Sequence, residues 1–188
     1  QAALKACDAA CTRIQAGIDL LKADERALAA FRFANAAMWR QRIHSLLSEA
    51  KRAGKAATLA DVDRPENRSW RPFQLAFILL NLPGLTRLDH PERSDSPSAL
   101  ADLLWFPTGG GKTEAYLGLT AYTLAIRRLQ GVVEGRLGHV GVAVIMRYTL
   151  RLLTLQQFQR AAALLCGFAA VPGFPWYVFV VLAAALVL

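Results

Sequence analysis

The sequence predicts an α/β fold in which helices pack against a parallel sheet, preceded by a hairpin of two helices. Short apolar runs at residues 103–106 and 141–146 come before stretches with helical periodicity at residues 114–129 and 150–166, and parallel sheets use this alternation of strand and helix. A glycine-rich loop that ends in Gly111, Lys112 and Thr113 joins the first run to its helix. Loops at such a junction bind phosphate groups.

These patterns divide the chain into four parts. They are a helical extension over residues 1–55, a linker over 56–69, an incomplete α/β domain over 70–167 and an apolar tail over 168–188.

The extension carries the hydrophobic pattern of two helices. Apolar side chains recur every three or four positions over residues 2–22, which predicts an amphipathic helix. Asp24 is a suitable N-cap for a second helix, and Gly54 is a suitable end for it. The second helix also holds aromatic and basic residues that could form a nucleic-acid surface: Phe31, Arg32, Phe33, Trp39, Arg40 and Arg42. Aromatic residues at helical spacing more often belong to a core, so we expect packing rather than base stacking.

The chain is polar over the linker and then turns apolar. Charged residues, asparagine and proline cluster between residues 56 and 69, which is typical of a linker. Pro72 suits the first turn of a helix, and the apolar run up to residue 81 predicts that this helix is buried. Pro83 and Gly84 should end the helix, and the charged residues 89–98 should form a surface loop.

The glycine-rich loop carries the strongest functional signal. In phosphate-binding loops, glycines let backbone N–H groups turn toward a phosphate, a lysine reaches its oxygens, and the next hydroxyl binds Mg²⁺. The cradle would be formed by Thr108, Gly109, Gly110 and Gly111. Lys112 would neutralise phosphate charge, and Thr113 would bind the metal. The general pattern has a further glycine where this chain has Phe106, so only the second half of the pattern matches.

Composition favours an intracellular protein with an anionic partner. The net charge of +8 attracts polyanions such as nucleic acid, although charge does not specify a fold. The cysteines Cys7, Cys11 and Cys166 do not complete the spacing of a zinc site, so we expect small buried thiols. The N-terminus lacks the pattern of a secretory signal, which predicts a reducing, cytoplasmic location.

The tail is unusually apolar, and no charged residue occurs between residues 161 and 188. A membrane-spanning helix needs about 20 apolar residues. Pro172, Gly173 and Pro175 interrupt this stretch. We therefore expect an aberrant or truncated terminus rather than a membrane anchor, with a buried strand as a third possibility.

Three segments together resemble the first motifs of superfamily 2 helicases. They are Arg71-Pro72-Phe73-Gln74, Thr108-Gly109-Gly110-Gly111-Lys112-Thr113, and the stretch from Arg147 to Gln157. The sequences of residues 104–119 and 146–153, which include the last two of these segments in whole or in part, most resemble the large helicase subunit of DISARM anti-phage systems. This resemblance covers about residues 28–166. It implies that residues 70–167 are part of a P-loop, RecA-like ATP-binding domain with an incomplete parallel sheet.

The resemblance also implies roles for individual residues. Gln74 stands where these helicases read adenine. One strand of nucleic acid would be contacted by Thr149, Arg151 and Gln157. That match is looser, because Tyr148 and Leu150 replace the proline and arginine usual in the family. The implied cofactors are ATP and Mg²⁺. The implied partners are nucleic acid, DNA rather than RNA, and other subunits of the defence system, but not a membrane.

Hydrolysis in this class needs features that the sequence does not show. One carboxylate after a buried strand holds Mg²⁺, a second orients the attacking water, and a second motor domain supplies an arginine. The carboxylates after Thr113 are Glu114 and Glu134, and neither follows a core strand. We therefore expect an ATP-binding fragment of a helicase or translocase that does not hydrolyse ATP alone. Two alternatives remain open: a regulatory module that binds nucleotide without catalysis, and a membrane-associated protein held by its tail.

Overall fold

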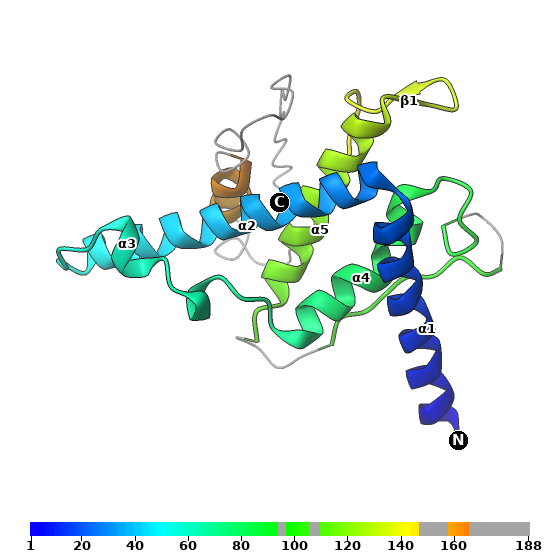
Figure 1. Ribbon diagram of the computed structural model, residues 1–188, viewed down its shortest axis with the longest axis horizontal. Coiled ribbons are helices and arrows are strands. Elements are labelled where there is room, and N and C mark those ends of the chain that lie inside the picture. The colour runs from blue at the N-terminus through cyan, green and yellow to red at the C-terminus, as the bar shows by residue number, and fades with distance from the viewer. Residues whose placement is uncertain (94–96, 106–109, 147–157, 166–188) are drawn as a thin grey trace, which may run out of the picture.

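The computed structural model describes residues 1–93, 97–105, 110–146 and 158–165 (Figure 1). The helices are α1 (Ala2–Ala23), α2 (Glu25–Arg52), α3 (Leu59–Val62), the 3₁₀ helix η1 (Pro65–Asn67), α4 (Pro72–Thr86) and α5 (Lys112–Gln130). Two short strands follow, β1 (Val132–Val133) and β2 (Arg136–Leu137). Residues 158–165 are helical as well.

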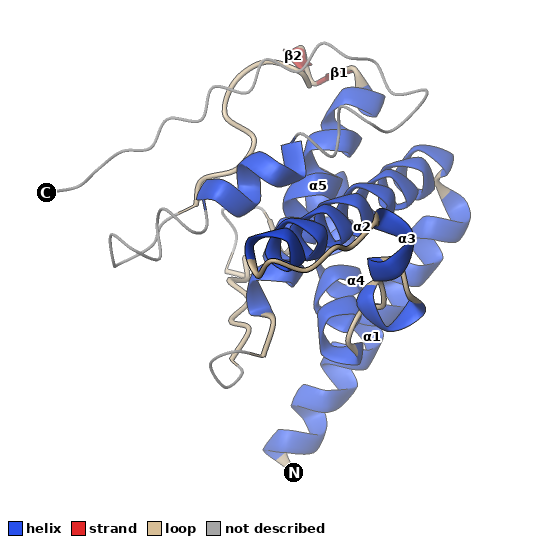
Figure 2. Ribbon diagram, turned by 90° about the vertical axis from the view of Figure 1, so that its left-hand side faces the viewer, coloured by secondary structure: helices blue, strands red, loops and turns tan. Residues whose placement is uncertain are grey.

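The four long helices share one hydrophobic core. α1 packs along α4, and α2 packs along α5, which also contacts α4 (Figures 1 and 2). Among the described residues, the largest completely buried side chains are Tyr122, Leu82, Leu117, Ile126 and Leu164. Burying such a side chain contributes about 1.5–3 kcal/mol. Because α1 packs mainly on α4 and α2 mainly on α5, these two N-terminal helices bury their apolar sides against α4 and α5 and not mainly against each other.

The two N-terminal helices are confirmed, but they do not pack on each other as a hairpin. Asp24 separates them, and its Oδ1 accepts hydrogen bonds from the backbone N of Arg26 and Ala27 at 2.8 and 3.1 Å. This is the N-cap expected from the sequence. The chain turns at Asp24, so α1 and α2 run in different directions and contact different helices (Figure 1).

The first turns of α1 project from the body of the molecule (Figures 1 and 2). Leu4 is 69% exposed, and both Cys7 and Cys11 are exposed. The prediction of buried thiols is wrong for these two cysteines, because the apolar stripe of α1 extends beyond the part of the helix that packs on α4. Cys166 lies outside the described residues.

α4 begins at Pro72 as predicted, but it continues through Pro83 and Gly84 to Thr86. A proline inside a helix leaves the carbonyl four residues earlier without its hydrogen bond, which here is the carbonyl of Leu79. Gly17 of α1 lies directly against this carbonyl, since a Cβ added to Gly17 would be 2.1 Å from the Leu79 oxygen. Leu82, Pro83 and Thr86 are buried. Packing of the helix end therefore outweighs the local stop signal.

The predicted RecA-like parallel sheet is wrong. The only sheet among the described residues is antiparallel and pairs Val132 with Leu137 and Val133 with Arg136. It lies beyond the C-terminal end of α5 (Figure 2).

The two runs predicted as strands, as far as they are described, are not strands. Residues 103–105 and 141–146 form no ladder with another described segment. Leu103, Trp105 and Ile145 are 84%, 82% and 86% exposed. A short apolar run favours burial, but a strand also needs a neighbour for its backbone hydrogen bonds. Neither run has such a neighbour among the described residues.

The predicted linker contains α3 and η1, and it is attached to α2 through Trp39. The Trp39 indole donates a hydrogen bond of 3.0 Å to Asp63, and Arg68 both pairs with Asp63 at 3.2 Å and covers the Trp39 ring. Phe33 is buried, as the core interpretation predicts. Trp39 is 38% exposed, yet its polar and ring contacts are with the linker.

Several predictions fall outside the described residues. These include the tail over 168–188, Phe106 at the end of the first predicted strand, and the first half of the helix predicted over 150–166; the described part of that helix, residues 158–165, is helical as expected. Among the described helices, none has both the length and the apolar character needed to cross a membrane.

Candidate nucleotide-binding site

The second half of the phosphate loop leads directly into α5. Gly111 is the N-cap of this helix, with φ 87° and ψ 30°. Glycine adopts this left-handed conformation without the strain that other residues incur. Lys112 and Thr113 are the first two residues of the helix. A helix N-terminus carries partial positive charge and unpaired N–H groups. The loop exit therefore combines that charge with a lysine and a hydroxyl, and the helix N-terminus alone already favours an anion.

Residues at the N-terminus of α4 bind the loop through its carbonyl groups. Gln74 Nε2 donates a hydrogen bond of 2.7 Å to the carbonyl of Gly111, and Arg71 Nη1 donates one of 2.8 Å to the carbonyl of Gly110. Gln74 Oε1 accepts from the backbone N of Arg71 at 2.9 Å. Only 5% of Gln74 is exposed. Two consecutive carbonyls of the loop are thus bound to α4.

This contact brings Gln74 to the loop across 37 positions of sequence. Both ends of its amide are engaged by backbone atoms, and each end keeps capacity for a further hydrogen bond through the second N–H of Nε2 and the second lone pair of Oε1. The role of Gln74 in adenine recognition stays a prediction. Its contact with Gly111 leaves little space, since a Cβ added to Gly111 would be 2.7 Å from Gln74 Nε2.

Glu114 occupies the first turn of α5, beside the loop exit. Its Oε1 accepts a hydrogen bond from Arg160, which lies in the helical residues 158–165. Its Oε2 is buried and has no hydrogen-bond donor among the described residues. A Cβ added to Gly111 would be 3.3 Å from this Oε2. A carboxylate oxygen without a donor therefore lies next to the residue where the loop joins the helix.

Thr113 is the residue that the sequence predicts as the Mg²⁺ ligand. Its hydroxyl makes no hydrogen bond to another described residue, so it is available to a Mg²⁺ ion carried by a nucleotide. No group of three or more His, Cys, Asp or Glu side chains in the described ranges could hold a metal without a nucleotide. Metal binding by Thr113 stays a prediction.

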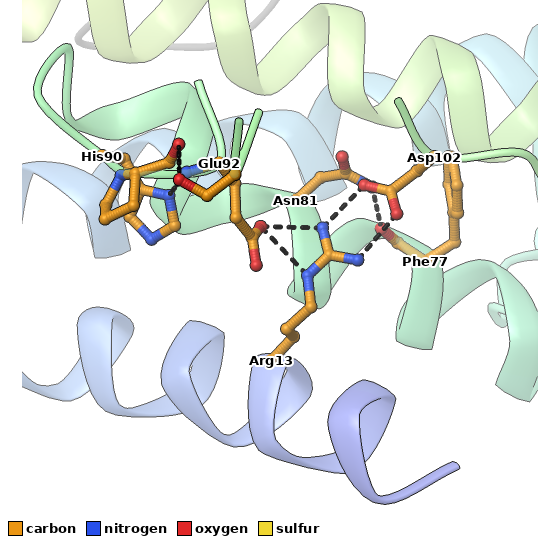
Figure 3. Close-up of polar contacts among 8 residues, drawn as sticks. Arg13, Phe77, Asn81, His90, Glu92 and Asp102 are labelled. Carbon is orange, nitrogen blue, oxygen red and sulfur yellow. Dashed lines mark hydrogen bonds and ion pairs between the residues drawn. The ribbon is translucent and has the colours of Figure 1, made fainter. Parts of the chain in front are cut away.

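The segment before the loop is anchored to α1 through Arg13. Figure 3 shows the Arg13 guanidinium between Glu92 and Asp102. Its two terminal nitrogens donate to the Asp102 carboxylate at 2.6 and 2.7 Å, and Nε donates to Glu92 at 3.0 Å. The bond to Asp102 raises the pKa of Arg13, and burial partly opposes this. The pairing fixes the start of the segment that leads into the phosphate loop.

The same region contains a cavity of about 470 Å³ between α1, α4, α5 and the β hairpin. Arg127 lines it, and the three side-chain nitrogens of this residue donate to the carbonyls of Gly138, Val140 and Val142. The cavity lining has four arginines, Arg13, Arg93, Arg127 and Arg136, and two carboxylates, Glu92 and Asp102, so its formal charge is about +2. It does not include the loop residues from Gly110 to Thr113.

The structure brings together part of the set predicted from the sequence. Gln74, Gly110, Gly111, Lys112 and Thr113 lie at one place. The remaining predicted residues, Thr108, Gly109, Thr149, Arg151 and Gln157, lie outside the described residues.

Sequence reasoning missed two arginines. Arg71 belongs to one of the motifs that carry the helicase resemblance, but that motif predicts no role for it, although it binds the loop carbonyl of Gly110. Arg160 gives no signal in the sequence, because its link to Glu114 spans 46 positions and depends on how the helices pack.

Comparison with known proteins shows what this region is similar to. No protein-family model matches the chain. The chain is 48% identical over 160 residues to the DISARM protein DrmA of Bacillus paralicheniformis (strain ATCC 9945a / NCIMB 11709 / CD-2). The matched stretch covers 84% of this chain but 14% of that protein. The chain is therefore related to DrmA, and it spans a small part of the length of this relative.

Proposed function

We propose that this chain is the nucleotide-binding part of an anti-phage defence protein, which acts as an ATP-dependent helicase or translocase on nucleic acid. The relation to the DISARM protein DrmA supports the role in defence. The observation that carries nucleotide binding is the geometry of the loop exit. Gly111 is left-handed immediately before Lys112 and Thr113 at the start of a 19-residue helix.

The contacts from α4 favour phosphate at this place. The carbonyl oxygens of Gly110 and Gly111 carry partial negative charge and would repel a phosphate. Arg71 and Gln74 bind these two oxygens. Lys112 and the N-terminus of α5 then supply positive charge for the β- and γ-phosphates, and Thr113 holds Mg²⁺. ATP with Mg²⁺ is the proposed ligand.

The proposed nucleic acid along which the protein moves is DNA rather than RNA. Other subunits of the defence system are the further proposed partners, and the cytoplasm is the proposed location. The proposed contacts to this nucleic acid are Thr149, Arg151 and Gln157.

ATP hydrolysis is proposed to need carboxylates beyond those of this chain. Glu114 is bound by Arg160, and Glu134 lies between β1 and β2 at φ 50°. We propose that neither carboxylate positions Mg²⁺ or an attacking water, because neither follows a predicted core strand in the sequence.

The first experiment measures binding of a fluorescent ATP analogue with Mg²⁺ to the full chain and to Lys112→Ala. Removing the lysine should raise the dissociation constant at least about tenfold, because a charge-assisted contact to phosphate is lost. Lys5→Ala removes the same charge from the exposed start of α1 and should leave binding unchanged. Equal affinity of wild type and Lys112→Ala would contradict the proposal. ATP turnover by this chain alone, with or without DNA, should stay near the uncatalysed level.

A further inference from the structure

The ion pair between Glu114 and Arg160 lies beside the phosphate loop, and the function proposed above assigns it no part in nucleotide binding. We propose that Arg160 is a positioning residue for nucleotide binding. It neutralises Glu114, the carboxylate at the loop exit, so that the first turn of α5 can accept a triphosphate. This inference rests on the proposed binding of ATP at the loop.

The geometry places Glu114 where its charge matters. It is the third residue of α5, after Lys112 and Thr113. Its unpaired Oε2 is buried close to Gly111, since a Cβ added to that glycine would lie 3.3 Å from the oxygen. The side chains of Glu114 and Arg160 are 24% and 37% exposed, so water screens their charges only in part.

Charge balance shows why a partner for Glu114 is needed. A carboxylate in the first turn is attracted to the positive end of the helix, which is the charge that a phosphate would use. The formal charges of Lys112 and Glu114 cancel within this turn. Arg71, which binds the Gly110 carbonyl, adds one positive charge beside the loop, and Arg160 raises the total to about +2 when full charges are counted. Without it, a triphosphate would approach a partly buried, uncompensated carboxylate.

Arg160 is not required to hold its own helix in place. Ala161 is 8% exposed and Leu164 is completely buried in the core shared with α2, α4 and α5. These apolar contacts anchor residues 158–165 independently of the ion pair. Replacing the Arg160 side chain should therefore change the charge at the loop without releasing the helix.

The test measures the dissociation constant of a fluorescent ATP analogue with Mg²⁺ for the full chain and four variants. Arg160→Gln should raise the constant about tenfold, because Glu114 is left uncompensated. Arg160→Lys keeps the charge and should bind within about threefold of wild type. The double variant Glu114→Gln/Arg160→Gln removes both charges and should recover binding to a similar level. Arg42→Gln, which removes one exposed arginine of α2, is the matched control and should bind like wild type.

Recovery in the double variant is the decisive result, since a purely structural role of Arg160 would not be restored by removing its partner. Equal affinity of wild type and Arg160→Gln would overturn the inference while leaving nucleotide binding intact. Equally weak binding by Arg160→Gln and the double variant would also overturn it. A wild-type chain that does not bind the analogue would instead contradict the proposed function, and it would contradict this inference as well. Thermal unfolding of each variant confirms that the compared chains are folded.

Discussion

At the scale of single residues, two constraints act on Gly111. Its φ of 87° favours glycine, and the side chain of Gln74 occupies the space that a Cβ would need. Gln74 in turn bonds to the carbonyl of Gly111 and to the backbone of Arg71. A change at Gly111 therefore affects the backbone conformation and the contact with α4 together.

Gly111→Ala should lower the free energy of unfolding by about 2–3 kcal/mol, from left-handed strain together with loss of the Gln74 hydrogen bond. Gly54→Ala separates the two effects. Gly54 has φ 72° but no atom within 4 Å of an added Cβ, so only strain of about 1 kcal/mol is expected. Denaturant unfolding of both variants measures the difference. Equal destabilisation would show that Gln74 does not constrain the loop.

The crossing of α1 and α4 shows how one element shapes another. Pro83 cannot donate a hydrogen bond to the carbonyl of Leu79, and Gly17 allows α1 to lie against that carbonyl. Arg13 strengthens the same side of α1 by binding Glu92 and Asp102. α1 is thereby joined both to α4 and to the segment before the phosphate loop.

Gly17→Ala should destabilise the chain by about 2–3 kcal/mol, because the helices must move apart to accommodate the methyl group. Gly84→Ala provides the matched change inside α4. The nearest atom to a Cβ there is His90 Nδ1 at 3.9 Å, so this variant should be neutral or gain up to about 1 kcal/mol in stability. Thermal denaturation of the two variants distinguishes crowding from helix propensity. A neutral Gly17→Ala would show that the crossing is not close.

The whole molecule is organised around α5, whose Tyr122 is completely buried. Its hydroxyl shares a hydrogen bond of 2.6 Å with Thr86 Oγ1, which joins α5 to the end of α4. Thr86 Oγ1 also donates to the carbonyl of Leu82 at 2.7 Å. Burial raises the pKa of Tyr122 to about 12, although the hydrogen bond with Thr86 partly opposes this.

Because the pKa of Tyr122 is raised in the folded chain, the free energy of unfolding should fall at alkaline pH. The folded chain keeps the Tyr122 proton in the range where the unfolded chain loses it, so the contribution is fully present below pH 10 and lost as the pH rises to about 12. The loss should reach about 2–3 kcal/mol. Tyr122→Phe should cost about 1 kcal/mol at neutral pH and lack this pH dependence. Denaturation of both chains between pH 8 and 12 tests this, because their difference in stability should shrink and then reverse. A difference that does not change with pH would contradict the shift.

Local patterns were sufficient to predict α1, α2, the start of α4 and α5 with its glycine-rich entry. Capping residues such as Asp24 and apolar residues three or four positions apart act within a few residues of the chain. The parallel sheet was predicted wrongly, because residues 103–105 and 141–146 have apolar side chains but no hydrogen-bonded neighbour among the described residues. The bonds of Gln74 to Gly111 and of Arg160 to Glu114 join residues 37 and 46 positions apart. Such contacts exist only once the helices have packed, so tertiary structure alone places these side chains at the loop.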